Sequence, residues 1–159
     1  MENLKKDYSQ LAEKYNLPSF QELDEEFEIL YFRELFEISH PLSFVRRRIY
    51  EKFGWVCGML QGIAQPNPSS MISIEESSFF SKEEKQKEHI NLLKTMMYYE
   101  RYSVSLDIET TEENDAEFIK QAYKKWIELK PMIKEISSKL KDGWKKDAGS
   151  KTRNNNYMG

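Results

Sequence analysis

Histidine and glutamate are residue types that bind metals. One pair of them in this sequence has the spacing that is found in di-iron helical bundles. Glu37 and His40 form a Glu-x-x-His pair, but Gln86 stands three positions before the other histidine, His89. A di-iron site requires two such pairs. The chain has two histidines and one cysteine, which are too few for a zinc cluster of imidazole and thiolate ligands. We therefore expect no metal site.

The single cysteine, Cys57, is the strongest nucleophile that the sequence offers. A cysteine nucleophile needs a neighbouring base and an oxyanion donor, and no residue near Cys57 in the sequence supplies either. Free cysteine in an apolar stretch usually serves as a small core side chain. We therefore assign no catalytic residue and no cofactor, and the sequence favours a non-enzymatic protein without deciding the point.

Glu100 and Arg101 interrupt a long apolar run and are a candidate buried polar pair. Adjacent residues on a helix point about 100° apart, so the two cannot pair with each other. One would face solvent while the other is held by a neighbouring helix, for instance Glu100 by one of the arginines 46–48. A buried pair of this kind fixes the register of helices more than it stabilises them. The alternative is a carboxylate tuned by the tyrosines around it.

The segment 139–153 is the candidate nucleic-acid contact, because cationic side chains surround a tryptophan there. A flexible cationic arm would neutralise a few phosphates and bind weakly, with a strong dependence on salt. The segment lacks a known nucleic-acid-binding module, and a solubilising tail is the alternative. The candidate contact residues are Lys139, Lys141, Trp144, Lys145, Lys146, Lys151 and Arg153.

Three glycines, Gly54, Gly58 and Gly62, recur every four residues in the predicted helix 41–64. Each glycine costs a helix about 1 kcal/mol relative to alanine, so the three together cost about 3 kcal/mol. A helix that keeps them favours close contact with something on that side. We consider three occupants, namely another helix of the chain, a second copy of the chain, or a flat ligand in a pocket.

The elements that would position these residues are helices, because apolar residues recur at steps of three and four along most of the chain. We expect helices at about 4–15, 20–38, 41–64, 82–108 and 111–144, with an apolar connection at 66–80. Ser19 and Glu22 form a capping box for the second helix. Pro131 should kink or divide the last one. The predicted fold is all-α, without a sheet: an up-down bundle of five to six helices, in which the third, fourth and fifth are long.

Length and composition indicate one domain. The 159 residues carry 32% charged side chains and a net charge of −3, which argues against a general nucleic-acid coat. We place the helical domain at residues 1–146 and a disordered polar and basic tail at 147–159. A single cysteine fits a reducing compartment, and the longest apolar run is too short to cross a bilayer. We expect a cytoplasmic protein without membrane contact.

The leading functional hypothesis is a non-enzymatic protein that acts through protein–protein interaction, with self-association as a homodimer as one form of it. The first alternative is an RNA- or ribosome-associated protein that uses the basic segment 139–153. The second alternative is a small-molecule-binding or enzymatic bundle with a pocket beside the glycine ridge, which we define as Gly54, Gly58 and Gly62.

Overall fold

The structure is a computed structural model and describes residues 2–30 and 39–150. A short π-helix, η1 (Glu84–His89), leads directly into α5. The α-helices, in chain order, are α1 (Glu2–Tyr15), α2 (Phe20–Phe27), α3 (Pro41–Ala64), α4 (Met71–Ser78), α5 (Ile90–Ile108) and α6 (Glu112–Ser150). These ranges contain no strand, so the predicted all-α class is confirmed for the described part of the chain.

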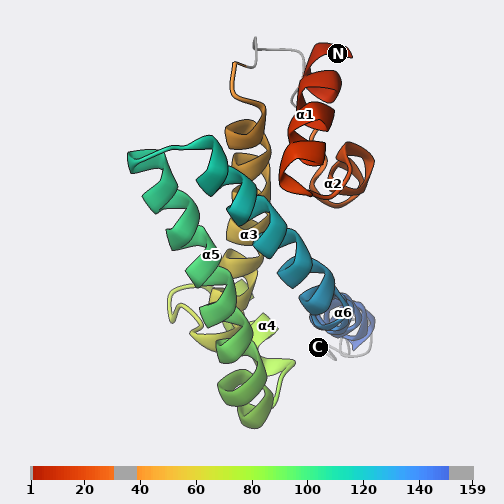
Figure 1. The fold of residues 1–159 in the computed structure, drawn as a ribbon. Coiled ribbons are helices and arrows are strands. Elements are labelled where there is room, and N and C mark those ends of the chain that lie inside the picture. Colours follow the sequence, from red (N-terminus) through yellow and green to blue (C-terminus); the bar gives the residue numbers. More distant parts are fainter. Residues whose placement is uncertain (1, 31–38, 151–159) are drawn as a thin grey trace, which may run out of the picture.

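Three long helices, α3, α5 and α6, make up the body of the molecule. Figure 1 shows α5 and α6 diverging from the loop that joins them, with α3 lying between them. The helix α3 packs against both α5 and α6, and α1 and α2 cover part of α3 at one end. The core therefore lies around α3, which occupies the predicted range of residues 41–64.

The core side chains of α3 are the apolar residues predicted from the three-and-four spacing. Phe53 is completely buried, and its ring stacks on Trp126 of α6 with a centroid distance of 5.8 Å. Phe53 also meets the edge of Tyr99 of α5, at 5.5 Å. Aromatic pairs at these distances add to the stabilisation that comes from buried area alone. Phe53 thus joins all three long helices.

The second helix is shorter than the sequence predicts. The capping box of Ser19 and Glu22 is present, but α2 ends at Phe27 because Glu28 adopts a left-handed backbone with φ of 53°. The side chain of Asp24 then accepts a hydrogen bond from the backbone N–H of Leu30, at 2.7 Å. The predicted continuation is therefore wrong for residues 28–30, and residues 31–38 lie outside the described residues.

The connection at 66–80 contains a helix, α4, that the sequence analysis missed. Ser70 caps it by accepting a hydrogen bond from the backbone N–H of Ser73. Ser73 and Ser77 donate hydrogen bonds to the last carbonyls of α3, and these bonds hold α4 in place. Met71 is 79% exposed and Ile72 63%, so the apolar residues at the start of α4 stay on the surface, whereas Phe80 at the end of the connection is buried in the core.

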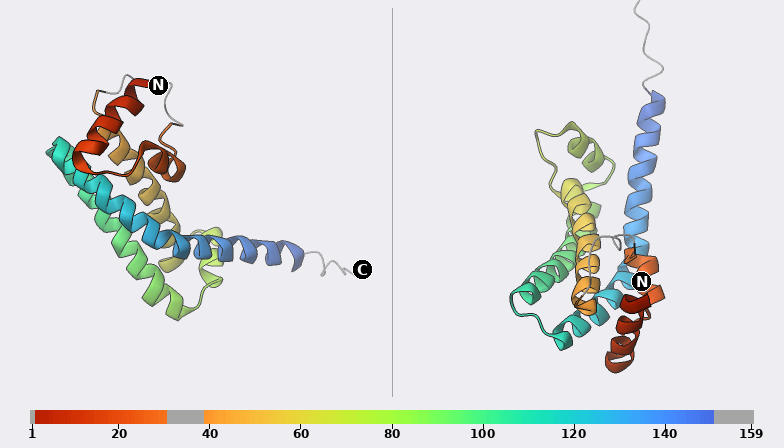
Figure 2. Two further views of the ribbon diagram at one scale, coloured as in Figure 1. Left: turned by 45° about the vertical axis from the view of Figure 1, so that its right-hand side comes forward. Right: turned by 90° about the horizontal axis from the view of Figure 1, so that it is seen from above.

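The last helix, α6, continues through Pro131 to Ser150 without division. Proline removes a backbone hydrogen bond from a helix interior and commonly bends it, and Figure 2 shows α6 changing direction near its middle. Beyond this bend, Lys139 and Trp144 contact η1 and α4, and only the last part of α6 extends past the other helices. The helix runs four residues beyond the expected domain boundary at 146, and the rest of the predicted tail, 151–159, lies outside the described residues.

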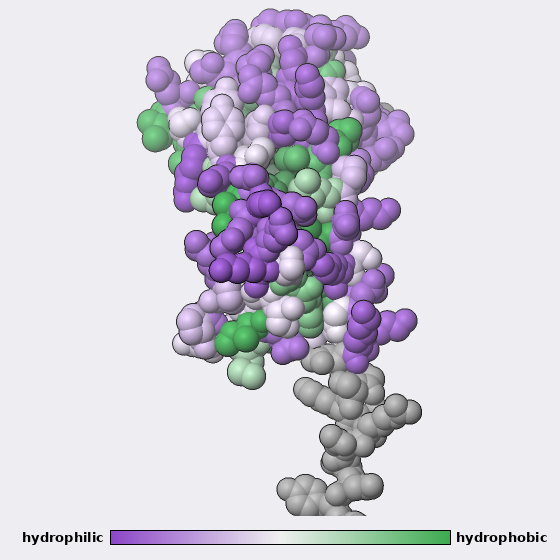
Figure 3. Space-filling view, turned by 90° about the horizontal axis from the view of Figure 1, so that it is seen from below, coloured by the Kyte–Doolittle hydropathy of each residue, from purple (hydrophilic) through white to green (hydrophobic). Residues whose placement is uncertain are grey.

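The surface agrees with the high content of charged residues. In the view of Figure 3, hydrophilic residues surround small hydrophobic patches. Within the described ranges, no helix is both long enough and apolar enough to cross a bilayer.

Candidate functional site

A buried arginine, Arg46, joins the three long helices at one end of the molecule. Its side chain is completely buried, and Nε donates to Oδ1 of Asp115 on α6 at 2.6 Å. Nη1 donates to the backbone carbonyl and the hydroxyl of Ser103 on α5, both at 2.7 Å. Ser43 donates a hydrogen bond to the second oxygen of Asp115 at 2.5 Å. All of the buried charge is therefore paired and hydrogen-bonded, as burial requires.

The third guanidinium nitrogen of Arg46 extends this network to the solvent-facing Asp107 near the end of α5. Nη2 donates to Oδ1 of Asp107 at 2.6 Å, and Nη2 of the exposed Arg47 approaches the same oxygen at 3.2 Å. The hydrogen bond from Arg46 is the main cause that lowers the pKa of Asp107. The network fixes the position of α5 along α3.

The sequence did not predict this network. Arginines 46–48 were expected only as partners for Glu100, although Arg46 falls within the apolar stripe between Leu42 and Ile49. A charged residue inside an apolar stripe is a signal of a buried ionic site. The partners, Ser103, Asp107 and Asp115, lie more than fifty residues away in the sequence, and no local pattern connects them with Arg46.

Glu100 and Arg101 do not form a buried pair within the chain. Glu100 is half-buried beside α3, while Arg101 is exposed. The nearest atom to a Cβ added at Gly54 would be Oε1 of Glu100, at 3.5 Å. Burial first, and then a hydrogen bond with Glu100, raise the pKa of the Cys57 thiol to about 12. Cys57 is therefore a protonated thiol at neutral pH and not an activated nucleophile.

The glycine ridge is not packed against another backbone of the described chain. A Cβ at Gly58 would meet nothing within 4 Å, and one at Gly62 would meet only Oγ of Ser73, at 3.9 Å. Intramolecular close packing does not account for Gly58, which is exposed. The other expected occupants, a second copy and a ligand, stay predictions.

Exposed apolar side chains lie on the side of α5 that carries Arg101. Met97, Arg101, Val104 and Ile108 follow one another at steps of four and three, which places them on one side of the helix. Val104 is 38% exposed and Ile108 is 85% exposed. We define the α3/α5 face by these residues together with the two glycines and the glutamate beside them: Gly54, Gly58, Met97, Glu100, Arg101, Val104 and Ile108.

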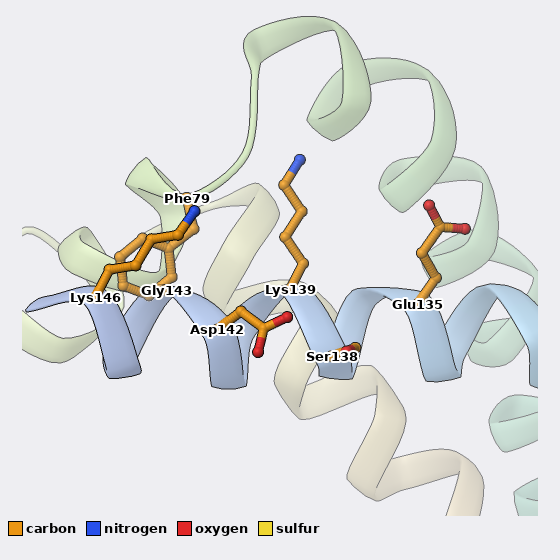
Figure 4. Close-up of a pocket in the computed structure, with 7 residues that line it drawn as sticks. All are labelled: Phe79, Glu135, Ser138, Lys139, Asp142, Gly143 and Lys146. Carbon is orange, nitrogen blue, oxygen red and sulfur yellow. The ribbon is translucent and has the colours of Figure 1, made fainter.

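Part of the predicted nucleic-acid contact is used inside the molecule. Figure 4 shows Lys139 extending from α6 toward η1, where its Nζ donates to Oε1 of Glu84 at 2.5 Å. This bond is the main cause that lowers the pKa of Glu84 to about 2, and hydrogen bonds from Ser81 contribute. Nζ of Lys139 also lies 5.0 Å from the centre of the Phe80 ring. The charge of Lys139 is thus already compensated.

Trp144 is also engaged within the chain. Its indole N–H donates to Oε1 of Glu76 on α4 at 3.0 Å, and its ring meets Phe79 edge-on at 5.6 Å. Phe79 rests directly on Gly143, where a Cβ would lie 2.4 Å from Cδ2 of that ring. A cavity of about 520 Å³ lies beside this contact (Figure 4). The close approach of the Phe79 ring to α6 therefore requires a glycine at position 143.

The remaining basic residues of the segment are exposed on the far end of α6. These are Lys141, Lys145 and Lys146, while Lys151 and Arg153 lie outside the described residues. Lys141 comes within 3.9 Å of the carboxylate of Asp142. Three of the predicted lysines, Lys141, Lys145 and Lys146, are thus exposed. Lys139 and Trp144, the latter 38% exposed, hold α6 against η1 and α4.

No metal site is apparent within the described ranges, where no three histidine, cysteine, aspartate or glutamate side chains cluster. His89 is almost completely buried, and its ring meets Phe80 edge-on at 4.7 Å. Burial is the main cause that lowers the pKa of His89. Its Nδ1 has no hydrogen-bond partner in the described structure.

In comparisons with known proteins, no family model, no curated protein and no solved structure matches this chain.

Proposed function

We propose that the protein is a non-enzymatic helical protein that acts through macromolecular interaction, and that it forms a homodimer through the α3/α5 face. The observation that carries this proposal is the pair of adjacent, opposite charges on that face. Neither Glu100 nor Arg101 has an ion-pair partner among the described residues. A second copy would supply a partner for both.

The charges of the face are complementary to themselves. In a dimer with twofold symmetry the same patch of each copy faces its counterpart. Glu100 of one copy can then meet Arg101 of the other, and the symmetry repeats the pair. Opposite charges that meet across an interface fix its register and select the partner.

The other residues of the α3/α5 face also favour a second copy of the chain. Ile108 is 85% exposed, and burying such a side chain stabilises an interface by about 1.5–3 kcal/mol. Gly58 leaves open space at the surface of α3, so a helix of the second copy could approach the α3 backbone closely. This contact would account for glycines that otherwise cost α3 helical stability.

Sedimentation velocity over a range of concentrations tests the proposal. We expect the wild-type protein to sediment at twice the chain mass of 19.0 kDa, and Arg101→Glu to shift it to the chain mass, because two glutamates would then face each other. Lys120→Glu, an equal charge reversal on the exposed side of α6, should leave the dimer intact. A wild-type protein that stays monomeric at all concentrations would rule the dimer out.

Two further features belong to this proposal. The up-and-down order of the helices is the arrangement that we propose for the fold.

A cytoplasmic location is supported by the single cysteine, Cys57, which is buried and cannot form a disulfide within the chain.

A second candidate function, RNA binding, is favoured by the exposed lysines in the C-terminal part of α6, the part that follows its change of direction (Figure 2). These are Lys141, Lys145 and Lys146. If they contact phosphates, replacing Lys145 and Lys146 by glutamate should abolish the fluorescence anisotropy change of a labelled single-stranded RNA, and salt should weaken the wild-type signal steeply. The Lys120→Glu variant should bind the RNA as the wild type does. Equal binding by all three proteins would remove this candidate.

A further inference from the structure

A buried histidine, His89, lies at the junction between the C-terminal part of α6 and the connection from α4 to η1. It is the last residue of the π-helix η1, and π-helical turns are rare in proteins and frequent at functional sites. His89 is 2% exposed, and its Nδ1 has no hydrogen-bond partner among the described residues. Most buried polar atoms have a partner, so this imidazole is an exception that calls for an explanation.

One lysine of α6 closes the junction over this histidine. Nζ of Lys139 donates to Oε1 of Glu84 at 2.5 Å (Figure 4), and it lies 5.0 Å from the centre of the Phe80 ring. The same ring is buried and meets the imidazole of His89 edge-on at 4.7 Å. Lys139, Phe80 and His89 therefore form a continuous set of contacts from α6 to η1. A separation of α6 from Phe80 would bring water to the imidazole.

The charged groups around His89 belong to η1 and α6. Burial is the main cause that lowers the pKa of His89. Glu84 and Glu88 of η1 raise this pKa, whereas Lys139 of α6 and Lys85 of η1 lower it further. The helix α3 also packs against η1, and the buried side chains in its C-terminal half are uncharged. The imidazole therefore stays neutral most readily while the junction is closed.

We propose that protonation of His89 opens this junction, so that the part of α6 after Ser138 separates from η1 and α4 while the three long helices stay packed. In the closed junction the added proton would charge a buried ring whose Nδ1–H has no acceptor among the described residues, which is costly. The charged imidazole would also compete with Lys139 for the carboxylate of Glu84. Opening relieves both costs, because water reaches the ring and Lys139 leaves Glu84. The proposal does not depend on the dimer.

The direction of the pH dependence follows from the two states of the junction. In the open state the imidazole has an ordinary pKa of about 6.5, and in the closed state its pKa is lower. The closed state is therefore favoured fully above about pH 6.5 and progressively less as the pH falls below it. The pKa of Glu84 is about 2, so the carboxylate that Lys139 binds stays ionised in mild acid.

Amide hydrogen exchange, followed by mass spectrometry and corrected for the intrinsic exchange rate at each pH, tests the proposal. We expect amides in the range 139–150 to be less protected than those of α3, because they exchange through a smaller opening. Their protection should fall by about two- to tenfold between about pH 7.5 and pH 5.5. His89→Phe should abolish this fall, whereas His40→Asn, at an exposed histidine, should keep it.

A second variant tests the ion pair without changing the buried ring. Lys139→Met replaces a side chain that is 42% exposed. It should lower the protection of the range 139–150 at neutral pH and reduce the further fall in acid, because Glu84 is then available to the protonated imidazole. Unchanged protection in this variant would disprove the role of Lys139.

Three further results would overturn the proposal. The first is protection of the range 139–150 that does not depend on pH. The second is a fall in protection that His89→Phe leaves unchanged, because another group would then be responsible. The third is equal protection of this range and of α3, since the junction would then open only when the whole chain unfolds.

Discussion

Arg46 on α3 and Asp115 on α6 form a buried ion pair in which Nε lies 2.6 Å from Oδ1 and both side chains are at most 2% exposed. The two residues are 69 positions apart in the sequence. Their pairing, with the bonds from Arg46 to Ser103 and Asp107 on α5, sets how the three long helices meet.

The first prediction concerns this pair. Arg46→Met leaves the carboxylate of Asp115 buried without a cation, and we expect the free energy of unfolding in urea to fall by about 3–5 kcal/mol. The double variant Arg46→Met, Asp115→Leu removes both charges and should recover much of that loss. If the single replacement costs less than about 1 kcal/mol, the pair does not organise the helices.

The second prediction compares two glycines. Gly143→Ala places a Cβ where the Phe79 ring now lies, 2.4 Å from Cδ2, so the ring must move and we expect a loss of about 1–3 kcal/mol. Gly62→Ala meets only Ser73, at 3.9 Å, and should stabilise α3 by about 0.5–1 kcal/mol. Chemical denaturation measures both. Equal effects of the two replacements would contradict the close contact at Gly143.

The third prediction concerns His89 and acid. Burial lowers its pKa in the folded protein, while Glu84 and Glu88 raise it and Lys139 and Lys85 lower it. Because the unfolded chain binds the proton more readily, the stability that neutral His89 confers is complete above its unfolded pKa of about 6.5 and declines as the pH falls below it.

We therefore expect the melting temperature of the wild type to decrease between about pH 7.5 and pH 5.5. His89→Phe should flatten this dependence, since phenylalanine does not titrate. His40→Asn replaces the exposed histidine and is the matched control, which should keep the wild-type slope. A slope that survives in His89→Phe would assign it to other groups.

The fourth prediction separates the fold of one chain from the dimer. A Cβ at Gly58 meets nothing of the described chain within 4 Å, so Gly58→Leu should keep the circular dichroism spectrum of the monomer and raise its stability by about 0.5–1 kcal/mol, as the removal of a glycine from a helix interior does. In the proposed dimer the leucine would occupy the space of the second copy and weaken self-association. A variant that dimerises as strongly as the wild type would place the interface elsewhere.

Local sequence patterns predicted the helices well where the interactions that start and end a helix lie within one segment. The third helix was predicted at 41–64 and is observed over that range, because its apolar spacing and flanking prolines are signals within one segment. Asn16, just after the first helix, adopts the left-handed backbone, with φ of 53°, which asparagine adopts more readily than most residues. Glu28 adopts the same conformation, which a glutamate in the sequence does not predict.

The connections and the ionic network depended on contacts that a pattern does not contain. The helix α4 is held by serine hydroxyls that donate to the end of α3, and the burial of His89 follows from its packing on Phe80. Likewise, Lys139 and Trp144 were predicted as free contact residues. Their partners, Glu84 and Glu76, are 55 and 68 residues away in the sequence, so only the folded structure identifies them.

The central claim, self-association through the α3/α5 face, is tested most directly by mixing two charge-reversal variants. Glu100→Arg and Arg101→Glu should each sediment as a folded monomer, because like charges then face each other across the twofold axis. An equimolar mixture should sediment as a dimer, since arginines 100 and 101 of one variant meet two glutamates of the other. A mixture that stays monomeric, or single variants that dimerise as the wild type does, would contradict the account.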